Sequence, residues 1–411
     1  MNVPFFQINF YSGLLLVGFV QASVSIAILT VRAFREQRRH DALAALILLS
    51  SVLYTTQWML GFGGWYDSHD WRTTLMFYLP WDHLLAFGPL IWLYFQAVTN
   101  AAFRFRYRHC WHFLPWAVSL LPLAGAGLYD LLYGWLLLSQ PPTGFFGTLG
   151  FAREAIGFGP YPWAGVLVPF LVVHLLVYLV RTGLAYRAYR DYLAAEFSSP
   201  DGRTLAGLRN VLCVLLFGIV LTLLVAAYQR LTGHVPYVSE WYHHLVLSVM
   251  AFAAGILFLE VAGERTRELR FIPAPSVSQP SPDPGPLPAI RALFARTEDR
   301  MQRQRDFLEP ELRLAELAKR LGTTDKSLSG AINACANQNF NDYVNRWRCA
   351  YLVERLQEGG HHERTLLALA LDAGFNSKST FNRAFRKCYG CSPVEVIQQL
   401  ASGENVAQKM I

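Results

Sequence analysis

Long uncharged runs in the first 260 residues constrain the fold more than any other feature of the sequence. Ser12–Val31 is twenty residues without a charged side chain, and Ala42–Phe62 is a second such run. The apolar core of a bilayer is about 30 Å thick and takes about 20 helical residues to cross. The sequence therefore predicts an all-α bundle of seven transmembrane helices. The other five predicted spans are Phe77–Thr99, Trp111–Tyr129, Pro162–Val180, Asn210–Gln229 and Trp241–Leu259.

Composition agrees with a chain that lies largely in lipid. Only 16% of the 411 residues are charged, whereas soluble domains carry about 25%. Hydrophobic residues make up 53% of the chain, which excludes a disordered protein. Six cysteines over this length exclude a small domain held together by disulfides. The first apolar run is predicted to be a retained helix rather than a signal peptide, because no Lys or Arg precedes it.

Arginines are distributed unequally between alternate loops, and this predicts the orientation in the membrane. Fifteen arginines follow the first, third, fifth and seventh runs, whereas only Arg72, Arg153 and Arg230 lie in the other loops. Basic side chains stay on the cytoplasmic side. We therefore expect the N-terminus outside and the C-terminus in the cytoplasm. The excess of 31 Arg over 5 Lys suggests a GC-rich bacterial genome, so the predicted location is the bacterial inner membrane.

A proline-rich stretch divides the chain into two unlike pieces. Seven prolines stand between Pro273 and Pro288, and such a stretch favours extended polyproline II over a packed core. We interpret it as a spacer rather than as a binding site for a proline-recognising partner. The predicted domains are a transmembrane region at 1–262, a cytoplasmic stub and linker at 263–288, and a soluble helical domain at 289–411.

The soluble region contains the same local layout twice: a short apolar helix, a glycine, a capping residue and a second helix. Glycine allows the tight turn that ends the first helix, and Thr or Ser caps the start of the next. One such layout is a weak indication of a helix-turn-helix unit, but two are much stronger. The units cover about residues 314–334, with Gly322 and Thr324 at the turn, and 366–387, with Gly374 and Ser377 at the turn.

The second helix of each unit has an apolar stripe that is expected to pack inward. The opposite face is polar, and in a helix-turn-helix protein this face meets the major groove. The polar faces carry Lys326, Ser329, Gly330 and Asn333 in the first unit and Lys378, Ser379, Asn382 and Arg383 in the second.

The stretch from about Phe307 to Gln398 resembles the DNA-binding domain of AraC-type (AraC/XylS) transcription regulators, some of which are anchored in membranes. The most specific match is the block Ala373–Lys387, followed by Gly390-Cys-Ser-Pro393. Asn345-Arg-Trp-Arg348 also resembles an element of some members. The resemblance covers about 90 of the 411 residues and says little about the membrane part. Further matching residues are Leu317, Ala318, Gly322, Leu328, Ser329, Ala350, Leu356, Ala370, Phe381 and Phe385.

The resemblance implies seven helices in two subdomains joined by a long helix, here about Phe340–Gln357. It also implies binding to promoter DNA, often as a homodimer on repeated half-sites, and no cofactor. Arg or Lys reads guanine edges, and Asn or Gln reads adenine edges, so Arg383 and Asn382 are the leading base readers. The predicted DNA-binding residues are Lys326, Ser329, Asn333, Lys378, Ser379, Asn382 and Arg383, with Arg346, Arg386 and Lys387 expected on phosphate.

Two residues depart from the family pattern. Gly330 stands where many members have a large polar side chain, so the first unit is expected to read fewer bases. Ile332 replaces a common core aromatic. Charge is nearly balanced across the domain, with twelve Lys and Arg against eleven Asp and Glu from Asp306 to Gln398. The alternative interpretation of the second polar face is the solvated surface of a protein-binding module.

Ionisable side chains within the predicted spans mark a candidate sensing site, because such groups are costly in lipid. Asp82 and His83 are expected about two turns into the third span, near a long outer loop, Gly134–Tyr161. Asp with His also suits a divalent metal, although no metal is assigned, and polar groups at the wet boundary are the plainer alternative. The candidate pocket for an unknown small molecule or envelope signal comprises Gln57, Asp82, His83, His174, His243 and His244.

Together the two pieces predict a membrane-bound one-component regulator whose DNA binding is controlled by a signal in the transmembrane region. A static anchor would give the same hydropathy. The alternative is a transporter or membrane receptor whose helical cytoplasmic domain binds protein rather than DNA. An enzyme is not expected, because no paired nucleophile and base or phosphate-binding glycine loop is present in the sequence.

Overall fold

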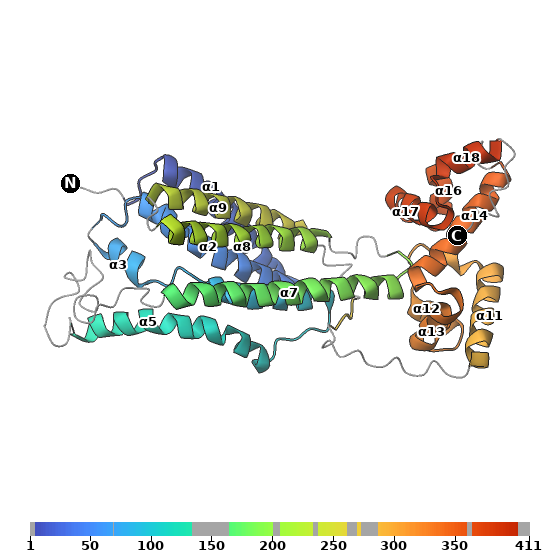
Figure 1. Ribbon diagram of the computed structural model, residues 1–411, viewed down its shortest axis with the longest axis horizontal. Coiled ribbons are helices and arrows are strands. Elements are labelled where there is room, and N and C mark those ends of the chain that lie inside the picture. Colours follow the sequence, from blue (N-terminus) through green and yellow to red (C-terminus); the bar gives the residue numbers. More distant parts are fainter. Residues whose placement is uncertain are drawn as a thin grey trace. The chain divides into compact units, whose positions relative to one another are not determined.

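The computed structural model describes residues 5–68, 70–133, 164–199, 206–232, 237–260, 269–272, 287–359 and 364–401. Within these ranges the regular structure is helical, apart from two isolated β-bridges, Asn100–Arg270 and Phe197–Arg313. The predicted all-helical fold is therefore confirmed for this part of the chain. The chain forms two units, Met1–Ala185 with Leu205–Ile272 and Tyr186–Thr204 with Pro273–Ile411 (Figure 1).

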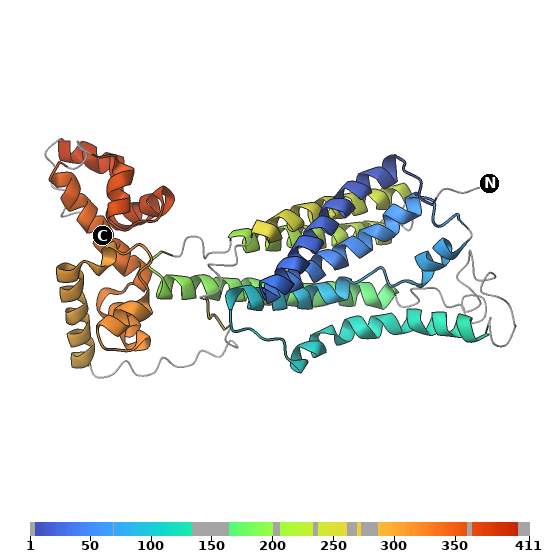
Figure 2. The ribbon, with the colours of Figure 1, turned by 180° about the vertical axis from the view of Figure 1, so that it is seen from behind.

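The first unit is built around α1, α2 and α9, which pack against one another. Helix α4 packs against α2, and α8 packs against α9. Figure 2 shows α1 and α2 side by side. The helices are α1 Phe10–Arg35, α2 Arg39–Phe62, α3 Trp71–Tyr78, α4 Leu84–Thr99, η1 Tyr107–Phe113, α5 Leu114–Asp130, α7 Ala164–Glu196, α8 Ala206–Thr232 and α9 Tyr237–Glu260.

Five helical stretches in the described part of the chain are long and apolar enough to cross a membrane: α1, α2, η1 with α5, α7 and α9. Helix α4 is apolar but has 16 residues, which span only about 24 Å. For α8 an apolar stretch is described over Arg209–Gly218. The count of seven spans therefore stays a prediction. The predicted loop Gly134–Tyr161, stub residues 263–268 and linker residues 273–286 lie outside the described residues.

The continuous helix predicted over Phe77–Thr99 is wrong in its first part. A break at Leu79–His83 separates α3 from α4. Pro80 lacks a backbone N–H and disfavours helical backbone at the residue before it, and that residue is extended, with φ −80° and ψ 138°. Asp82 and His83 consequently lie in the break before α4 and not two turns inside a helix.

The helices of the first unit bury small and polar residues at their contacts and expose many apolar side chains. Ser12, Gly18 and Ser25 are buried on α1, and the helices approach so closely that a Cβ at Gly18 would lie 2.1 Å from Oγ of Ser248. Small residues at helix contacts and apolar residues outside are typical of membrane helices. The exposed apolar side chains of α1 and α7 are Leu14, Val17, Val20, Val24, Ile28, Val31, Phe170, Val173, Val177, Val180 and Leu184.

The second unit contains two small cores, and α14 contributes to both. Tyr343 and Val344 join the core beneath α12 and α13, whereas Leu352 and Val353 join the core beneath α16 and α17. The last turns of α7, Tyr186–Glu196, also belong to this unit. The other helices are α11 Leu287–Gln304, η4 Asp306–Leu308, α12 Leu314–Arg320, α13 Asp325–Ala336, α14 Phe340–Gln357, α16 Leu366–Asp372, α17 Lys378–Tyr389 and α18 Pro393–Ala401.

Candidate nucleic-acid interface

The first predicted helix-turn-helix unit is formed by α12 and α13. Gly322 between them has φ +67°, in the left-handed region that favours glycine. The Thr324 hydroxyl accepts a hydrogen bond from the backbone N–H of Ser327 at 3.2 Å and caps α13. Leu328 and Ile332 are buried beneath this helix. The predicted turn, cap and inward stripe are therefore all present.

The second helix-turn-helix unit, formed by α16 and α17, has the same local structure. Gly374 has φ +91°, and the Ser377 hydroxyl accepts a hydrogen bond from the backbone N–H of Thr380 at 3.2 Å. Phe381 and Phe385 are buried at 2% and 0% exposure, which fixes the orientation of α17 about its axis. The opposite face of α17 is consequently held toward solvent.

Most of the predicted DNA-binding residues lie on these outward faces. Ser329 is half-buried, and Arg346 on α14 is half-buried as well. On α17 the exposed set carries four basic side chains and no acid, which makes a local positive surface suited to phosphate. The exposed members are Lys326, Asn333, Lys378, Ser379, Asn382, Arg383, Arg386 and Lys387.

Two of the residues predicted to contact phosphate have acidic partners within the protein. The Arg346 guanidinium lies 3.0 Å from a carboxylate oxygen of Glu298, and Nζ of Lys387 lies 2.7 Å from a carboxylate oxygen of Asp342. Lys387 is exposed, so water screens its ion pair and little free energy holds it in place. These two side chains would have to exchange a carboxylate for phosphate on binding DNA.

Arg348 connects the two helix-turn-helix units. Its side chain is 0% exposed, and its Nε donates a hydrogen bond to the carbonyl of Phe307 at 2.7 Å. A Cβ at Gly374 would lie 2.7 Å from the same carbonyl and 3.0 Å from Nε, so only glycine fits this approach. Burial lowers the pKa of Arg348 to about 10. The sequence identified Arg348 only as a family-matching residue, because its contacts come from distant segments.

Comparisons with known proteins agree with this geometry. Residues 317–399 match a family model described as a helix-turn-helix domain. Over 114 residues the chain is 29% identical to the virulence regulon transcriptional activator VirF of Yersinia enterocolitica and to the thermoregulatory protein LcrF of Yersinia pestis. The C-terminal region is an AraC-type helix-turn-helix domain. The predicted resemblance is therefore confirmed.

These relatives match a segment of the chain and not its whole length. The matched segment is 26% of this chain and 39% of each relative, so the chain spans about two fifths of their length. No solved structure matches the chain. The first unit is consequently interpreted from its own residues.

The residues predicted to form a sensing pocket contact different neighbours. Gln57 Nε2 donates to the Tyr66 hydroxyl at 3.3 Å, and Asp82 Oδ1 accepts from the backbone N–H of Leu84 at 2.8 Å. His83 Nδ1 accepts from Trp116 Nε1 at 3.0 Å. The His174 ring lies 5.0 Å from that of Tyr178. None of these contacts joins two of the predicted pocket residues, whereas His243 and His244, adjacent in sequence, have ring centroids 5.0 Å apart.

The two histidines of α9 lie against aromatic side chains that the sequence analysis did not include. His243 and His244 are 6% and 1% exposed. The His244 ring stacks on Trp58 at 4.3 Å and lies 4.9 Å from Tyr54. The spacing of four residues between Tyr54 and Trp58 on α2 was the available signal. Among the described residues, no three His, Cys, Asp or Glu side chains are grouped to hold a metal ion.

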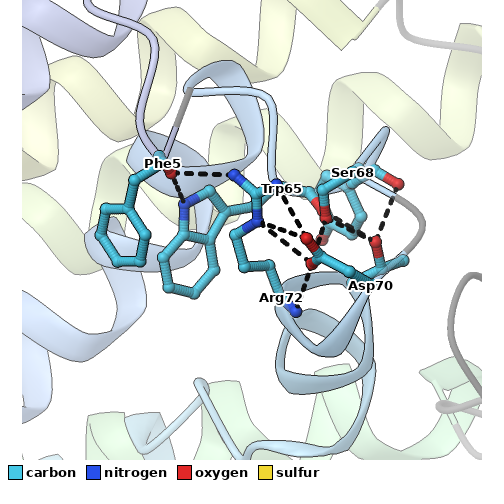
Figure 3. A network of polar contacts seen from close by, with 7 residues as sticks. Phe5, Trp65, Ser68, Asp70 and Arg72 are labelled. Atoms are coloured by element: carbon cyan, nitrogen blue, oxygen red, sulfur yellow. Dashed lines mark hydrogen bonds and ion pairs between the residues drawn. The ribbon is translucent and has the colours of Figure 1, made fainter. Parts of the chain in front are cut away.

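A second polar network, also missed from sequence, surrounds Arg72 in the first unit (Figure 3). Arg72 is 6% exposed and its Nη2 lies 2.8 Å from a carboxylate oxygen of Asp70. The Phe5 carbonyl accepts from Nη1 of Arg72 at 3.2 Å and from Nε1 of Trp65 at 2.9 Å. Hydrogen bonds from Arg72 hold the pKa of Asp70 at about 2. The network fixes the residues before α1 onto the segment before α3.

Proposed function

We propose that this protein is a membrane-anchored transcription regulator that binds promoter DNA through its AraC-type domain. The observation that carries the proposal is the pair of capped helix-turn-helix units, joined by α14, with polar faces open to solvent. Both matched relatives are named as regulators. In this proposal Arg383 and Asn382 read base edges, followed by Lys378, and Arg386 lies near phosphate.

Membrane anchoring is supported by the character of the first unit. Five long apolar helical stretches in its described part expose many Val, Leu and Phe side chains and bury Ser, Thr and Gly at helix contacts. An outward apolar surface of this extent is unfavourable in water and favourable in lipid. The excess of arginine in alternate loops supports a cytoplasmic C-terminal domain at the bacterial inner membrane.

Signal sensing is the finer part of the proposal, and it is assigned to the first unit. The support is the pair of buried histidines on α9, with the His244 ring stacked on Trp58 and tilted against Tyr54 of α2. Buried ionisable groups in an apolar unit are costly and mark function. A His244→Phe variant is expected to keep the stack and to lose inducer-dependent reporter output at unchanged protein level. Retained induction would remove His244 from the sensing site.

Chromatin immunoprecipitation of the full-length protein in its own cells tests the DNA-binding function. Discrete peaks are expected for the wild-type chain, and Arg383→Ala should lose them. Arg355→Ala is the matched control, because Arg355 is exposed on α14 and pairs with Glu358. Peaks that survive in Arg383→Ala, or that disappear equally in the control, would contradict the assigned interface.

A further inference from the structure

The segment that follows α7 belongs to the second unit, although in the sequence it stands between two stretches of the first unit. Phe197 is 3% exposed and forms an antiparallel bridge with Arg313. The Ser198 N–H donates to the Leu312 carbonyl at 3.1 Å, and the Ser198 carbonyl accepts from Asn341 Nδ2 at 2.6 Å. Phe197–Ser199 is therefore bound to the domain through both backbone and side chain.

This segment completes the surroundings of Arg348. Nη1 of Arg348 donates to the Ser198 carbonyl at 3.5 Å and to the Ser199 hydroxyl at 3.2 Å, and it has no other acceptor among the described residues. Nη2 donates to the Ser198 hydroxyl at 3.1 Å and to the carbonyl of Glu309 at 2.7 Å. Without Phe197–Ser199, one end of a fully buried guanidinium would lack a partner, which is costly.

Arg348 also sets the joint between the two helix-turn-helix units. It contacts the Phe307 carbonyl beside the first helix-turn-helix unit. Its guanidinium carbon lies 5.8 Å from the centre of the Phe375 ring in the second helix-turn-helix unit. Arg348 thus helps to set the distance and angle between α13 and α17. DNA binding depends on that geometry, because the two recognition helices must reach successive groove segments together. A segment that enters the joint is positioned to change DNA binding.

Phe197–Ser199 directly follows a helix that begins in the first unit. Helix α7 is continuous over 33 residues, Ala164–Glu196, and its part up to Ala185 belongs to the first unit. A displacement or rotation of α7 would thus be transmitted along the chain to Phe197–Ser199.

We propose that the joint at Arg348 is a docking surface for Phe197–Ser199, and that docking restrains DNA binding until a signal releases it. The proposal rests on the proposed DNA-binding function and adds its regulation. The direction follows from charge. Glu196 at the end of α7 interacts electrostatically with Asp325, the first residue of α13, and with Arg313. The N-terminal residues of a recognition helix meet DNA. Docking therefore brings a further carboxylate toward phosphate and engages the Arg313 guanidinium, which lies 5.6 Å from the Phe197 ring.

The test uses full-length protein in lipid nanodiscs and a promoter fragment recovered by chromatin immunoprecipitation. Phe197→Asp removes the buried ring and should release the segment. Ala188→Asp adds the same acid at an exposed position of α7 and is the matched control. Ser198→Ala with Ser199→Ala is a milder release variant that keeps Phe197 and the backbone contacts, in case Phe197→Asp fails to fold.

Hydrogen exchange and DNA affinity are measured on each variant. Release should speed exchange of peptides covering 193–199 and 341–352, and it should tighten promoter binding by about 10-fold, within the usual range of coupling between sites. Ala188→Asp should change neither. Unchanged exchange in both release variants would overturn the docking. Faster exchange with unchanged or weaker DNA binding would overturn the restraint.

The two proposals fail in different ways. If neither the wild-type chain nor any variant binds the promoter fragment more tightly than a scrambled sequence of equal length, the DNA-binding function itself is overturned. Exchange in the release variants still reports the docking in that case, because it is measured without DNA. If the wild-type chain binds and the release variants do not differ from it, only the regulation is overturned.

Discussion

Arg72 in the first unit and Arg348 in the second are both buried, yet they are stabilised in different ways. Arg72 is paired with the carboxylate of Asp70, two residues away, at 2.8 Å. Among the residues that the structure describes, Arg348 donates to neutral oxygens. Two of the residues that supply them, Ser198 and Ser199, lie about 150 positions earlier in the chain. The charge of Arg72 is balanced by a neighbouring carboxylate, although Arg72 also donates to the Phe5 carbonyl, 67 positions earlier. Arg348 is surrounded by neutral groups from distant segments.

The difference teaches which network can act as a switch. A buried charge with its own carboxylate keeps its partner whatever the rest of the molecule does. A buried charge surrounded by hydroxyl and carbonyl dipoles depends on every one of them, because no single contact offsets the loss of hydration. The Arg72 network is therefore expected to be a fixed anchor, whereas the Arg348 joint responds to the presence of Phe197–Ser199.

Replacing Arg348 should give the largest effect. Arg348→Met removes the hydrogen bonds that the guanidinium donates to the carbonyls of Phe307 and Glu309 and to the two serines, and the second unit should lose about 3 kcal/mol of unfolding free energy. Pulse proteolysis of the full-length chain in urea, read from peptides of the second unit, measures the loss. Arg355→Met on the same helix should change little, and equal stability of the two variants would break the comparison.

Removing Arg72 should destabilise only the first unit. Arg72→Met frees Asp70, which is 37% exposed and can be hydrated, so the expected loss is smaller, about 1–2 kcal/mol. The measurement is the same proteolysis read from first-unit peptides, together with promoter affinity, which should stay unchanged. A loss of promoter affinity as large as that of Arg348→Met would show that Arg72 is no independent anchor.

Removing the two hydroxyls of the docked segment should have a smaller effect. Ser198→Ala with Ser199→Ala takes two acceptors from Arg348 but keeps the Ser198 carbonyl contacts, so about 1 kcal/mol is expected. Together with Arg348→Met it forms a double-mutant cycle in the urea assay. Strictly additive losses would mean that the serines and Arg348 are not energetically coupled.

Lowering the pH should also distinguish the two networks, and of the four expected effects this one is the smallest. Because Arg72 holds the pKa of Asp70 at about 2, ionised Asp70 stabilises the folded state at neutral pH, and that contribution is lost as pH falls from about 4 toward 2. Asp70→Asn should therefore lower first-unit stability at pH 6 but not at pH 2. A stability difference from wild type that does not shrink with acid would contradict the ion pair.

Sequence reasoning recovered the parts of the fold that depend on near neighbours. The long helix predicted over Phe340–Gln357 agrees with α14, and the turn glycines and caps lie within a few residues of the helices they delimit. The break at Pro80 was missed, although the proline is a local signal, because the apolar run around it outweighed one residue.

The contacts of Arg348 could not be predicted in the same way. They connect residues 41 and about 150 positions apart, and no periodicity or spacing in the sequence relates Ser198 to α14. The apolar spans predicted the character of the first unit, but the stack of His244 on Trp58 required two helices to be placed side by side. The DNA-binding residues follow from the predicted helix faces, and their contacts with bases stay predictions.

The continuity of α7 with the docked segment has a consequence for the order in which the protein is made. Synthesis produces Phe197–Ser199 before α8, α9, the linker and Arg348 exist. The segment must therefore wait, with Phe197 uncovered, until about 150 further residues have been translated and two more helices have been placed. The DNA-binding unit thus cannot be complete until the first unit is nearly finished, so assembly of one is timed by the other.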